Sequence, residues 1–234
     1  MTSPDKIILY TNRLCPWAHR AHIALQELKI PFKEVVIDMG KTHTPEYLKI
    51  NPRGLVPAMS YNGEIIIESG IITQFLTDAY PSHLVPASNA AGGALRRARI
   101  ARFADAYTSK FNSSQLGILL TKSEEERETL CEKAVACLVE EVEPLLADAS
   151  PFFGGSDKLT LAEVLTGSFA LRLKTLTKAE VYPKSLWAMI EERAPNFFKW
   201  VAAVTAHPSV TCKYDEKEIV EATKAKLAEI TGSA

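Results

Sequence analysis

The sequence is short of the features that mark several classes of protein. Only four of its 234 residues are cysteine, and these four show no metal-ligand spacing. No apolar run is long enough to span a bilayer, and the first residues lack the apolar core of a signal peptide. The formal net charge is −1, so neither nucleic acid nor an anionic membrane is an expected partner. We therefore expect a cytoplasmic protein without a metal site.

What remains is the composition of an ordinary globular protein, long enough for two small domains. Hydrophobic residues make up 47% of the chain and charged residues 24%. A reducing compartment argues against structural disulfides, so we interpret Cys131, Cys137 and Cys212 as packing residues. Cys15, the fourth cysteine, has different surroundings.

Cys15 lies where a predicted strand and turn give way to a predicted helix. Pro16 suits the first turn of a helix, because the N–H that proline lacks would have no partner there. Free N–H groups and the helix dipole at such an end favour a thiolate over a thiol. Arg13, His19 and Arg20 add positive charge nearby. The pattern favours a reactive thiolate at Cys15; the alternative is a small buried apolar filler.

This motif has no second cysteine. A C-x-x-C redox pair would carry one at position 18, where this chain has Ala18. A mixed disulfide at Cys15 could therefore not be resolved from within the motif. A small soluble thiol is the expected source of the second sulfur.

The first eighty residues combine strand and helix signals in the order β-α-β, a connecting helix, then β-β-α. The β-α-β part predicts a parallel strand pair with a right-handed crossover. Asn62-Gly63 predicts a two-residue hairpin, and Ser69 is expected to cap the next helix. Strands are expected at 6–10, 32–38, 56–61 and 64–68, and helices at 16–28, 45–50 and 69–80.

Beyond a linker rich in Pro, Ser, Asn, Ala and Gly, the pattern is helical throughout. Capping boxes are predicted for Ser123 with Glu126 and for Thr160 with Glu163. The apolar helix after Thr160 is expected at the centre of its domain. Helices are expected at 94–120 with a bend near Gly117, at 123–147, from 160 through Leu173, and at 184–193, 195–206 and 215–230.

Several of these segments resemble the cytosolic glutathione S-transferases, and the resemblance covers nearly the whole chain. The segments are Asn51-Pro52-Arg53-Gly54-Leu55-Val56-Pro57-Ala58-Met59, the Glu68-Ser69 pair and the Thr160-Leu161-Ala162-Glu163 cap. The run Cys15-Pro16-Trp17-Ala18-His19-Arg20 is most similar to the omega-like, cysteine-type class. Glu163 is a departure, since the family usually has Asp there. Glu still satisfies a capping box, so the expected effect is local.

The resemblance implies a fold and an assembly. The fold is an α/β thioredoxin-like N-terminal domain, β-α-β-α-β-β-α, followed by an all-α C-terminal helical domain. The expected ranges are 1–82 for the glutathione-binding domain, 83–93 for the linker and 94–234 for the helical domain. The assembly is a homodimer in which the first domain of one subunit meets the long helices of the other.

The resemblance also implies glutathione as co-substrate. Val56 would pair its main chain with the cysteinyl part of the tripeptide, and Pro57 would be cis rather than an ordinary trans turn proline. Glu68 would face the γ-glutamyl ammonium, and Ser69 would meet its carboxylate at a helix N-terminus unless it is a plain cap. Lys41 would meet the glycyl carboxylate, the alternative being a solvated loop lysine.

The residues beside Cys15 complete the expected site. Leu14, Pro16 and Trp17 are included in it, with Leu14 and Trp17 expected on the substrate side unless they pack in the core. His19 and Arg20 are interpreted as structural or merely electrostatic. The second-domain wall of the acceptor pocket is expected near Tyr107, Phe111 and Trp187, for which core packing is the alternative.

The leading functional hypothesis is glutathione-dependent thiol transfer or reduction through a mixed disulfide at Cys15, acting on a disulfide or a small electrophile. One alternative is conjugation of glutathione to small electrophiles, for detoxification or biosynthesis, with Tyr10 or Thr11 near the reacting thiol. Another is a non-enzymatic glutathione-binding regulatory module.

Overall fold

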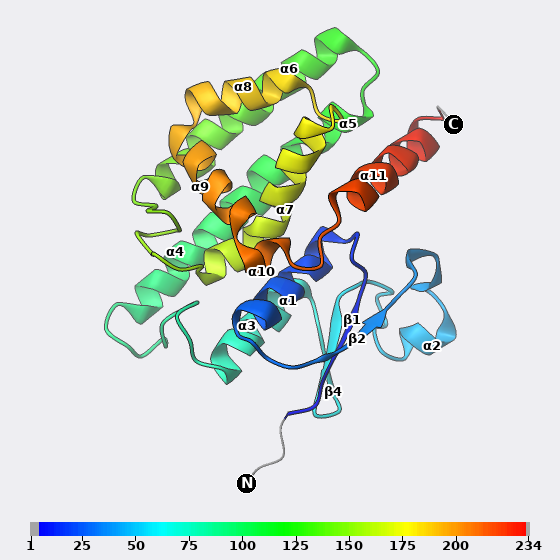
Figure 1. The fold of residues 1–234 in the computed structure, drawn as a ribbon, viewed down its shortest axis with the longest axis vertical. Helices are drawn as coiled ribbons and strands as arrows, with labels where there is room; N and C mark the ends of the chain where they lie inside the picture. Colours follow the sequence, from blue (N-terminus) through cyan, green and yellow to red (C-terminus); the bar gives the residue numbers. More distant parts are fainter. Residues whose placement is uncertain (1–4, 233–234) are drawn as a thin grey trace.

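The computed structural model describes residues 5–232, and the strands of this part form one four-stranded mixed sheet. The strands are β1 (Ile7–Thr11), β2 (Lys33–Val36), β3 (Ala58–Tyr61) and β4 (Glu64–Ile67). Their order across the sheet is β2-β1-β3-β4. Figure 1 labels β1, β2 and β4 of this sheet. β2 runs parallel to β1, while β3 is antiparallel to β1 and to β4. The predicted β-α-β unit is therefore confirmed.

Three helices complete the sheet domain in the expected order. They are α1 (Pro16–Glu27), α2 (Pro45–Leu48) and α3 (Ser69–Ala79), with a short 3₁₀ turn at Met39–Lys41. The hairpin at Asn62-Gly63 is confirmed: Tyr61 pairs with Glu64, and both turn residues have positive φ, as a type I′ turn requires.

The start of α3 differs from the prediction. Glu68, with φ 71°, occupies the N-cap position, and Ser69 is the first helical residue. No side-chain hydrogen bond caps this end. The prediction that Ser69 caps the helix is therefore wrong, because the residue that leaves the helical conformation is the one before it.

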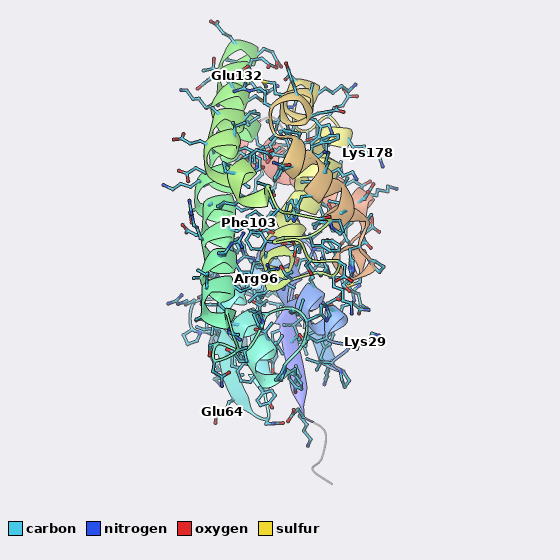
Figure 2. All side chains as sticks on the ribbon, turned by 90° about the vertical axis from the view of Figure 1, so that its left-hand side faces the viewer. Lys29, Glu64, Arg96, Phe103, Glu132 and Lys178 are labelled. Atoms are coloured by element: carbon cyan, nitrogen blue, oxygen red, sulfur yellow. The ribbon has the colours of Figure 1, made fainter. Side chains whose placement is uncertain are left out.

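The second half of the described chain is helical. Its α-helices are α4 (Gly93–Asp105), α5 (Leu116–Leu120), α6 (Glu124–Cys137), α7 (Leu161–Lys178), α8 (Lys184–Arg193), α9 (Pro195–Ala206), α10 (Pro208–Thr211) and α11 (Glu216–Thr231). In Figure 2 this part, marked by Glu132 and Lys178, stands above the sheet domain marked by Glu64 and Lys29. The short helix α10 was not predicted.

Two predicted helices are interrupted by wider turns. The helix expected over 94–120 changes to π-helical turns at Ala106–Asn112, and Gly117 lies inside α5 rather than at a bend. A π turn adds a residue and shifts the helix faces, and here Tyr107 and Phe111 are both fully buried. The helix expected over 123–147 ends as α6 and continues as π turns at Leu138–Val142 and a 3₁₀ turn at Glu143–Leu146.

The two predicted capping boxes have different outcomes. Ser123 accepts from the Glu126 N–H at 3.3 Å, but the Glu126 carboxylate accepts from Thr121 Oγ1 instead of returning to Ser123. Only half of that box forms. The box of Thr160 and Glu163 at the start of α7 is complete.

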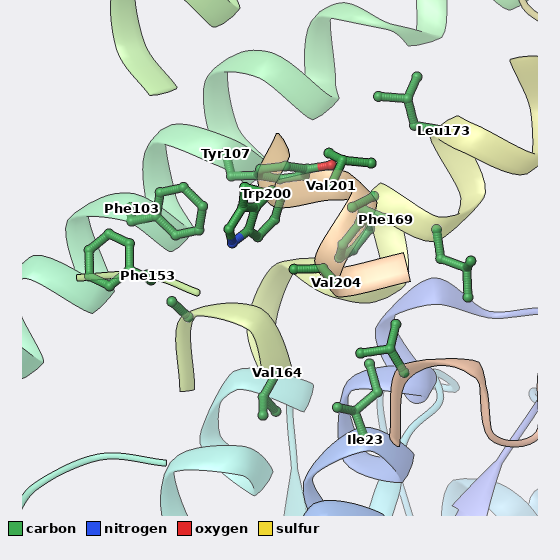
Figure 3. Packing of buried hydrophobic residues seen from close by; sticks show 14 of the residues in the cluster. Ile23, Phe103, Tyr107, Phe153, Val164, Phe169, Leu173, Trp200, Val201 and Val204 are labelled. Atoms are coloured by element: carbon green, nitrogen blue, oxygen red, sulfur yellow. The ribbon is translucent and has the colours of Figure 1, made fainter. Parts of the chain in front are cut away.

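α7 is the central helix of the fold, as predicted from its apolar sequence. It is buried along most of its length and packs against α1, α3, α4 and α9. Figure 3 shows Phe103 and Tyr107 beside Trp200, with Phe153 against Phe103. The same core continues to Ile23 of α1, so it joins both parts of the chain.

The segment between α3 and α4 holds an isolated bridge between Ser82 and Val85. The boundaries at 1–82 and 94–234 stay predictions, and residues 1–4 and 233–234 of those ranges lie outside the described part. Within residues 5–232, no helix has the length and apolar character needed to cross a membrane.

Candidate functional site

Cys15 caps the N-terminus of α1, as predicted. Its backbone is extended (φ −78°, ψ 119°), its side chain makes no capping hydrogen bond, and Pro16 is the first helical residue. Asn12 shapes the turn before it: Asn12 Oδ1 accepts from Leu14 N at 2.9 Å, and its backbone carbonyl accepts from Cys15 N at 3.1 Å. Cys15 is half-buried and packs against the small cluster of Ala18, Tyr47 and Val56, so its role as a reactive thiol stays a prediction.

The thiol faces the backbone just before β3. Cys15 Sγ lies 3.9 Å from the carbonyl oxygen of Val56, within the range of a sulfur hydrogen bond. The Val56–Pro57 peptide bond is cis, which confirms the prediction for Pro57. Within residues 5–232 the Val56 N–H has no hydrogen-bond partner. An unpaired main-chain segment of this kind accepts an extended peptide.

The residues before Val56 hold this backbone in place. Asn51 Nδ2 and Tyr47 Oη both donate to the Leu55 carbonyl, at 2.6 and 2.8 Å. Gly54 has φ +62°, and a Cβ there would come within 2.8 Å of the His43 ring. A larger residue at Gly54 would therefore require the His43 ring to move and would be strained at this positive φ.

Glu68 and Ser69 lie together at the first turn of α3. The Glu68 carboxylate pairs with the guanidinium of Arg53, and both side chains are partly exposed. Ser69 is buried, and its hydroxyl accepts from Arg20 Nη1 at 3.4 Å. The structure therefore places two arginines, Arg53 and Arg20, beside the predicted pair.

Lys41 is separate from these residues. It ends the turn at Met39–Lys41, is exposed, and its Nζ lies 4.0 Å from Asp38 Oδ2. Among residues 5–232, no contact joins its side chain to Cys15, Val56 or Glu68.

Trp17 lies on the seam between the two parts of the chain. Its ring is 43% exposed and makes an edge contact, 4.8 Å between centroids, with Phe169 of α7. The Arg20 guanidinium carbon lies 4.5 Å from the Trp17 ring centroid and 5.0 Å from that of Phe169. Leu14 and Pro16 are half-buried in the same turn.

The predicted second-domain wall is wrong for two of its three residues. Tyr107 and Phe111 are fully buried and pack against Phe197. Trp187 lines a hollow of about 400 Å³ between α7 and α8 that also involves Lys174. Thr11 is likewise buried, with its hydroxyl 3.0 Å from His22 Nε2, so it is not available to activate a bound thiol.

The basic residues near Cys15 in sequence have other partners. Arg13 forms a two-point contact with Glu34, at 2.8 and 3.1 Å. Burial, with Arg172 and His22 nearby, lowers the pKa of His19 to about 3, so His19 is neutral. Arg20 stacks on Trp17. The expectation that these three residues add positive charge near Cys15 is therefore wrong for His19, which is neutral. The guanidinium groups of Arg13 and Arg20 contact Glu34 and Trp17 instead.

A cation that the sequence analysis missed approaches the Cys15 turn from α7. Arg172 Nη2 donates to the carbonyls of Leu14 and Arg13, at 3.1 and 3.2 Å. Burial lowers the pKa of Arg172 to about 10, with Tyr214 and Cys15 acting in the opposite direction, so the group stays charged at neutral pH. Arg172 sits inside an apolar helical run, where no sequence signal distinguishes it from a framework residue.

Among residues 5–232 there is no group of three or more His, Cys, Asp or Glu side chains that could hold a metal ion. The candidate site consists of the half-buried thiol of Cys15, the unpaired backbone N–H of Val56, the N-terminus of α3 and the buried guanidinium of Arg172.

Comparison with known proteins agrees with this geometry. The family described as "Glutathione S-transferase, N-terminal domain" matches residues 14–79. Glutathione transferase omega-1 of Caenorhabditis elegans is 36% identical over 74 residues, 31% of this chain and 29% of that protein. Glutathione S-transferase omega-1 of Sus scrofa is 26% identical over 220 residues, 91% of this chain and 83% of that protein.

A solved structure, glutathione transferase Omega 2C from Trametes versicolor, aligns with a TM-score of 0.78 and 28% identity, over 96% of this chain and all of that one. The alignments to the first curated relatives span about a third of their length. Fold and site together define a thioredoxin-like domain joined to a helical domain. Residues 14–79 match the N-terminal domain of the glutathione S-transferases, and the relatives named above, to which the chain is similar, are of the omega class.

Proposed function

We propose that this protein is an omega-like glutathione transferase that uses Cys15 for glutathione-dependent thiol transfer. The observation that supports it most is the position of Cys15 Sγ, 3.9 Å from the Val56 carbonyl and at the start of α1. This placement puts the sulfur where the thiol of a peptide paired with Val56 would arrive.

The tripeptide binds through its backbone and its two charged ends. Its cysteinyl part pairs with the free N–H and the carbonyl of Val56, next to cis-Pro57. Its γ-glutamyl carboxylate takes the N-terminus of α3 at Ser69, where N–H groups are free, and its ammonium faces Glu68. Lys41, on its exposed loop, would meet the glycyl carboxylate.

The reaction proceeds in two exchanges. The Cys15 thiolate attacks the glutathionyl sulfur of a disulfide, the old S–S bond breaks, and the other sulfur leaves as a thiolate that takes up a proton. A glutathione thiolate then attacks the Cys15-bound glutathionyl sulfur and releases the Cys15 thiolate and glutathione disulfide. Ala18 leaves no internal thiol to compete with this second step.

The acceptor binds beside Cys15, against the exposed face of Trp17 and the half-buried Leu14. We also propose that the protein is cytoplasmic and homodimeric, as the superfamily resemblance implies. The residues 1–82 and 94–234 would then form the glutathione-binding and helical domains.

Intact mass after exposure to glutathione disulfide tests the proposal. The wild-type chain should gain one glutathionyl group at Cys15, and Cys15→Ser should gain none. Cys212→Ser is the matched control, because Cys212 is also half-buried but donates to the Ser209 carbonyl at 3.2 Å, away from Val56. That variant should keep the adduct.

Two results would contradict thiol transfer. Efficient conjugation of glutathione to electrophiles without any adduct would favour the conjugating alternative. Binding of glutathione with no turnover of disulfides or electrophiles would favour a regulatory module.

A further inference from the structure

The hydroxyl of Ser69 is an unused hydrogen-bond donor at the N-terminus of α3. Its oxygen accepts from Arg20 Nη1 at 3.4 Å, and among residues 5–232 no group accepts a hydrogen bond from the hydroxyl itself. A hydroxyl carries one hydrogen and two lone pairs, so the bond from Arg20 occupies a lone pair and leaves the hydrogen free. No side chain caps this end of the helix. Ser69 therefore adds an O–H donor to the free N–H groups of the first turn.

Arg20, which lies against Ser69, is a buried cation without an ionic partner. The residue is 6% exposed, and within residues 5–232 no carboxylate lies within 4.0 Å of its guanidinium. Its Nε also has no hydrogen-bond partner in this part of the chain. Burial lowers the pKa of Arg20 to about 10, so the group stays charged at neutral pH. A buried cation that lacks a counter-charge favours the binding of an anion close to it.

Two aromatic rings hold the guanidinium in place. Its carbon lies 4.5 Å from the ring centroid of Trp17 on α1 and 5.0 Å from that of Phe169 on α7. The two rings contact each other edge to face, with 4.8 Å between their centroids. Contacts of this kind attract a cation to a ring but do not neutralise its charge. The position of Arg20 is thus fixed before any ligand binds.

The ligand that fits these groups is a carboxylate. Free N–H groups, a hydroxyl hydrogen and a nearby cation all favour an anion with more than one acceptor oxygen. The neighbouring acidic side chain, Glu68, pairs with Arg53 and not with Arg20. Under the proposed function, the γ-glutamyl carboxylate of glutathione binds at this end of α3.

We propose that Arg20 is a positioning residue for the γ-glutamyl carboxylate. It holds the oxygen of Ser69 so that the hydroxyl hydrogen is directed to the carboxylate, and it places a positive charge behind that hydroxyl. Arg20 acts through Ser69 and does not touch the ligand. The inference rests on the proposed function for its ligand, but it needs no chemistry at Cys15.

The test compares the binding of two ligands to the full chain by isothermal titration calorimetry at neutral pH. The first is S-methylglutathione, whose blocked sulfur cannot exchange. The second is the analogue in which a γ-aminobutyryl group replaces the γ-glutamyl group, so that only the carboxylate in question is missing. A purely structural role of Arg20 would change the affinity for both ligands equally.

The variants separate charge from shape. Arg20→Gln removes the charge, and Arg20→Lys keeps it but loses the planar group that stacks on the rings. Arg96→Gln is the matched control. Arg96 is also an arginine packed over an aromatic ring, 5.7 Å from the centroid of Phe153, and it donates to the carbonyls of Phe153 and Gly154 rather than to Ser69.

Arg20→Gln should weaken the binding of S-methylglutathione about tenfold and that of the analogue by less than about twofold. Arg20→Lys should lose about threefold, again for S-methylglutathione alone. Arg96→Gln should bind both ligands as the wild type does. In a Ser69→Ala background, Arg20→Gln should weaken the binding of S-methylglutathione by less than about twofold, because the two residues act through one hydroxyl.

An equal loss for both ligands in folded Arg20→Gln, or no loss for either, would overturn the proposal. An undiminished effect in the Ser69→Ala background would do the same. If Arg20→Gln does not fold, Arg20→Lys is judged by the same criterion: a loss confined to S-methylglutathione supports the proposal, and any other result overturns it.

Failure of the proposed function gives a different pattern. If the wild-type chain prefers S-methylglutathione to the analogue but gains no glutathionyl group at Cys15, thiol transfer alone is contradicted. A wild-type chain that does not bind S-methylglutathione would overturn both the proposed glutathione site and the role of Arg20.

Discussion

Glu163 and Arg172, two buried charged residues of α7, make contacts in different parts of the protein. Glu163, at the start of α7, is fully buried, and its carboxylate accepts from four donors within the helical domain. Arg172, further along α7, donates to acceptors in both domains. The first holds one domain together, and the second connects that domain to the reactive turn.

The contrast lies in what each charge leaves unsatisfied. Glu163 Oε1 accepts hydrogen bonds from Phe153 N and Trp200 Nε1, each at 2.8 Å. Oε2 accepts from the Thr160 N–H and hydroxyl, at 2.8 and 2.7 Å. Each oxygen of the Glu163 carboxylate therefore accepts two hydrogen bonds. Arg172 has no ionic partner among the described residues. Both charges are hydrogen-bonded, and a buried charge with all its hydrogen bonds made is expected to matter for stability.

Removing the charge of Glu163 should have the largest effect. In Glu163→Gln an amide NH₂ must face two donors, so we expect the free energy of unfolding to fall by about 3 kcal/mol or more. Urea unfolding measures this. An unfolding free energy equal to that of the wild type would contradict a stabilising role for the Glu163 charge.

Glu163→Asp gives a finer comparison, because it shortens the side chain and keeps the charge. The shorter side chain keeps the Thr160 cap but loses reach to Phe153 N and Trp200 Nε1, so we expect a smaller loss, about 1–2 kcal/mol. A loss equal to that of Glu163→Gln would show that the reach of the side chain matters as much as its charge.

Trp200→Phe should come next, at about 2 kcal/mol. It removes the indole N–H that donates to Glu163 and leaves a gap among Phe103, Tyr107 and Phe197. In the Glu163→Gln background the same change should have a smaller effect, because the two groups act on one hydrogen bond. Additive losses in this double-mutant cycle would contradict the coupling.

His19, which accepts a hydrogen bond from Arg172, makes the stability of the folded protein depend on pH. Its folded pKa of about 3 lies below the ordinary value of 6.5, so between these values the unfolded chain binds the extra proton. Stability should therefore fall as pH drops from about 6.5 towards 3, by up to about 1.4 kcal/mol per pH unit for this group. His22, lowered to about 4 by burial, adds to the same window.

His19→Gln should reduce the pH dependence of the unfolding free energy by the contribution of one proton. Urea unfolding between pH 4 and 6 measures this. Gln keeps an oxygen that accepts from Arg172. An unchanged slope would show that His19 is already protonated in the folded protein, and Arg172 would then face a second cation.

The smallest effect is expected where α7 ends at the surface. Lys178 pairs with Glu216 at 3.1 Å, but both side chains are mostly exposed. Lys178→Ala should change the free energy of unfolding by less than about 0.5 kcal/mol in a thermal or urea melt. A larger change would contradict the expectation that an exposed ion pair contributes little to stability.

The parts of the site that could be predicted from the sequence are those made by neighbours in the chain. The Cys15–Pro16 helix start, the Asn62-Gly63 hairpin and the Thr160–Glu163 box all depend on residues a few positions apart. Local chemistry decides such features before the chain folds.

The features that were missed depend on distant partners. Arg172 contacts a turn some 158 positions away in the sequence, and nothing in its own helix signals that contact. The effect of Glu163 was expected to be local, yet it also binds Trp200, 37 positions on. The π turns at Ala106–Asn112 likewise follow from packing of Tyr107 and Phe111 in the core, which no local propensity reveals.

The unpaired N–H of Val56 has a consequence for selectivity. A backbone group recognises amide geometry and is indifferent to side-chain identity, so it discriminates between thiols by what surrounds the sulfur. Free cysteine or a simple alkyl thiol offers no internal amide to that N–H, whereas a thiol in the middle of a short peptide does. Under the proposed function, the backbone beside Pro57 would therefore select thiols carried by a peptide before any difference in reactivity acts.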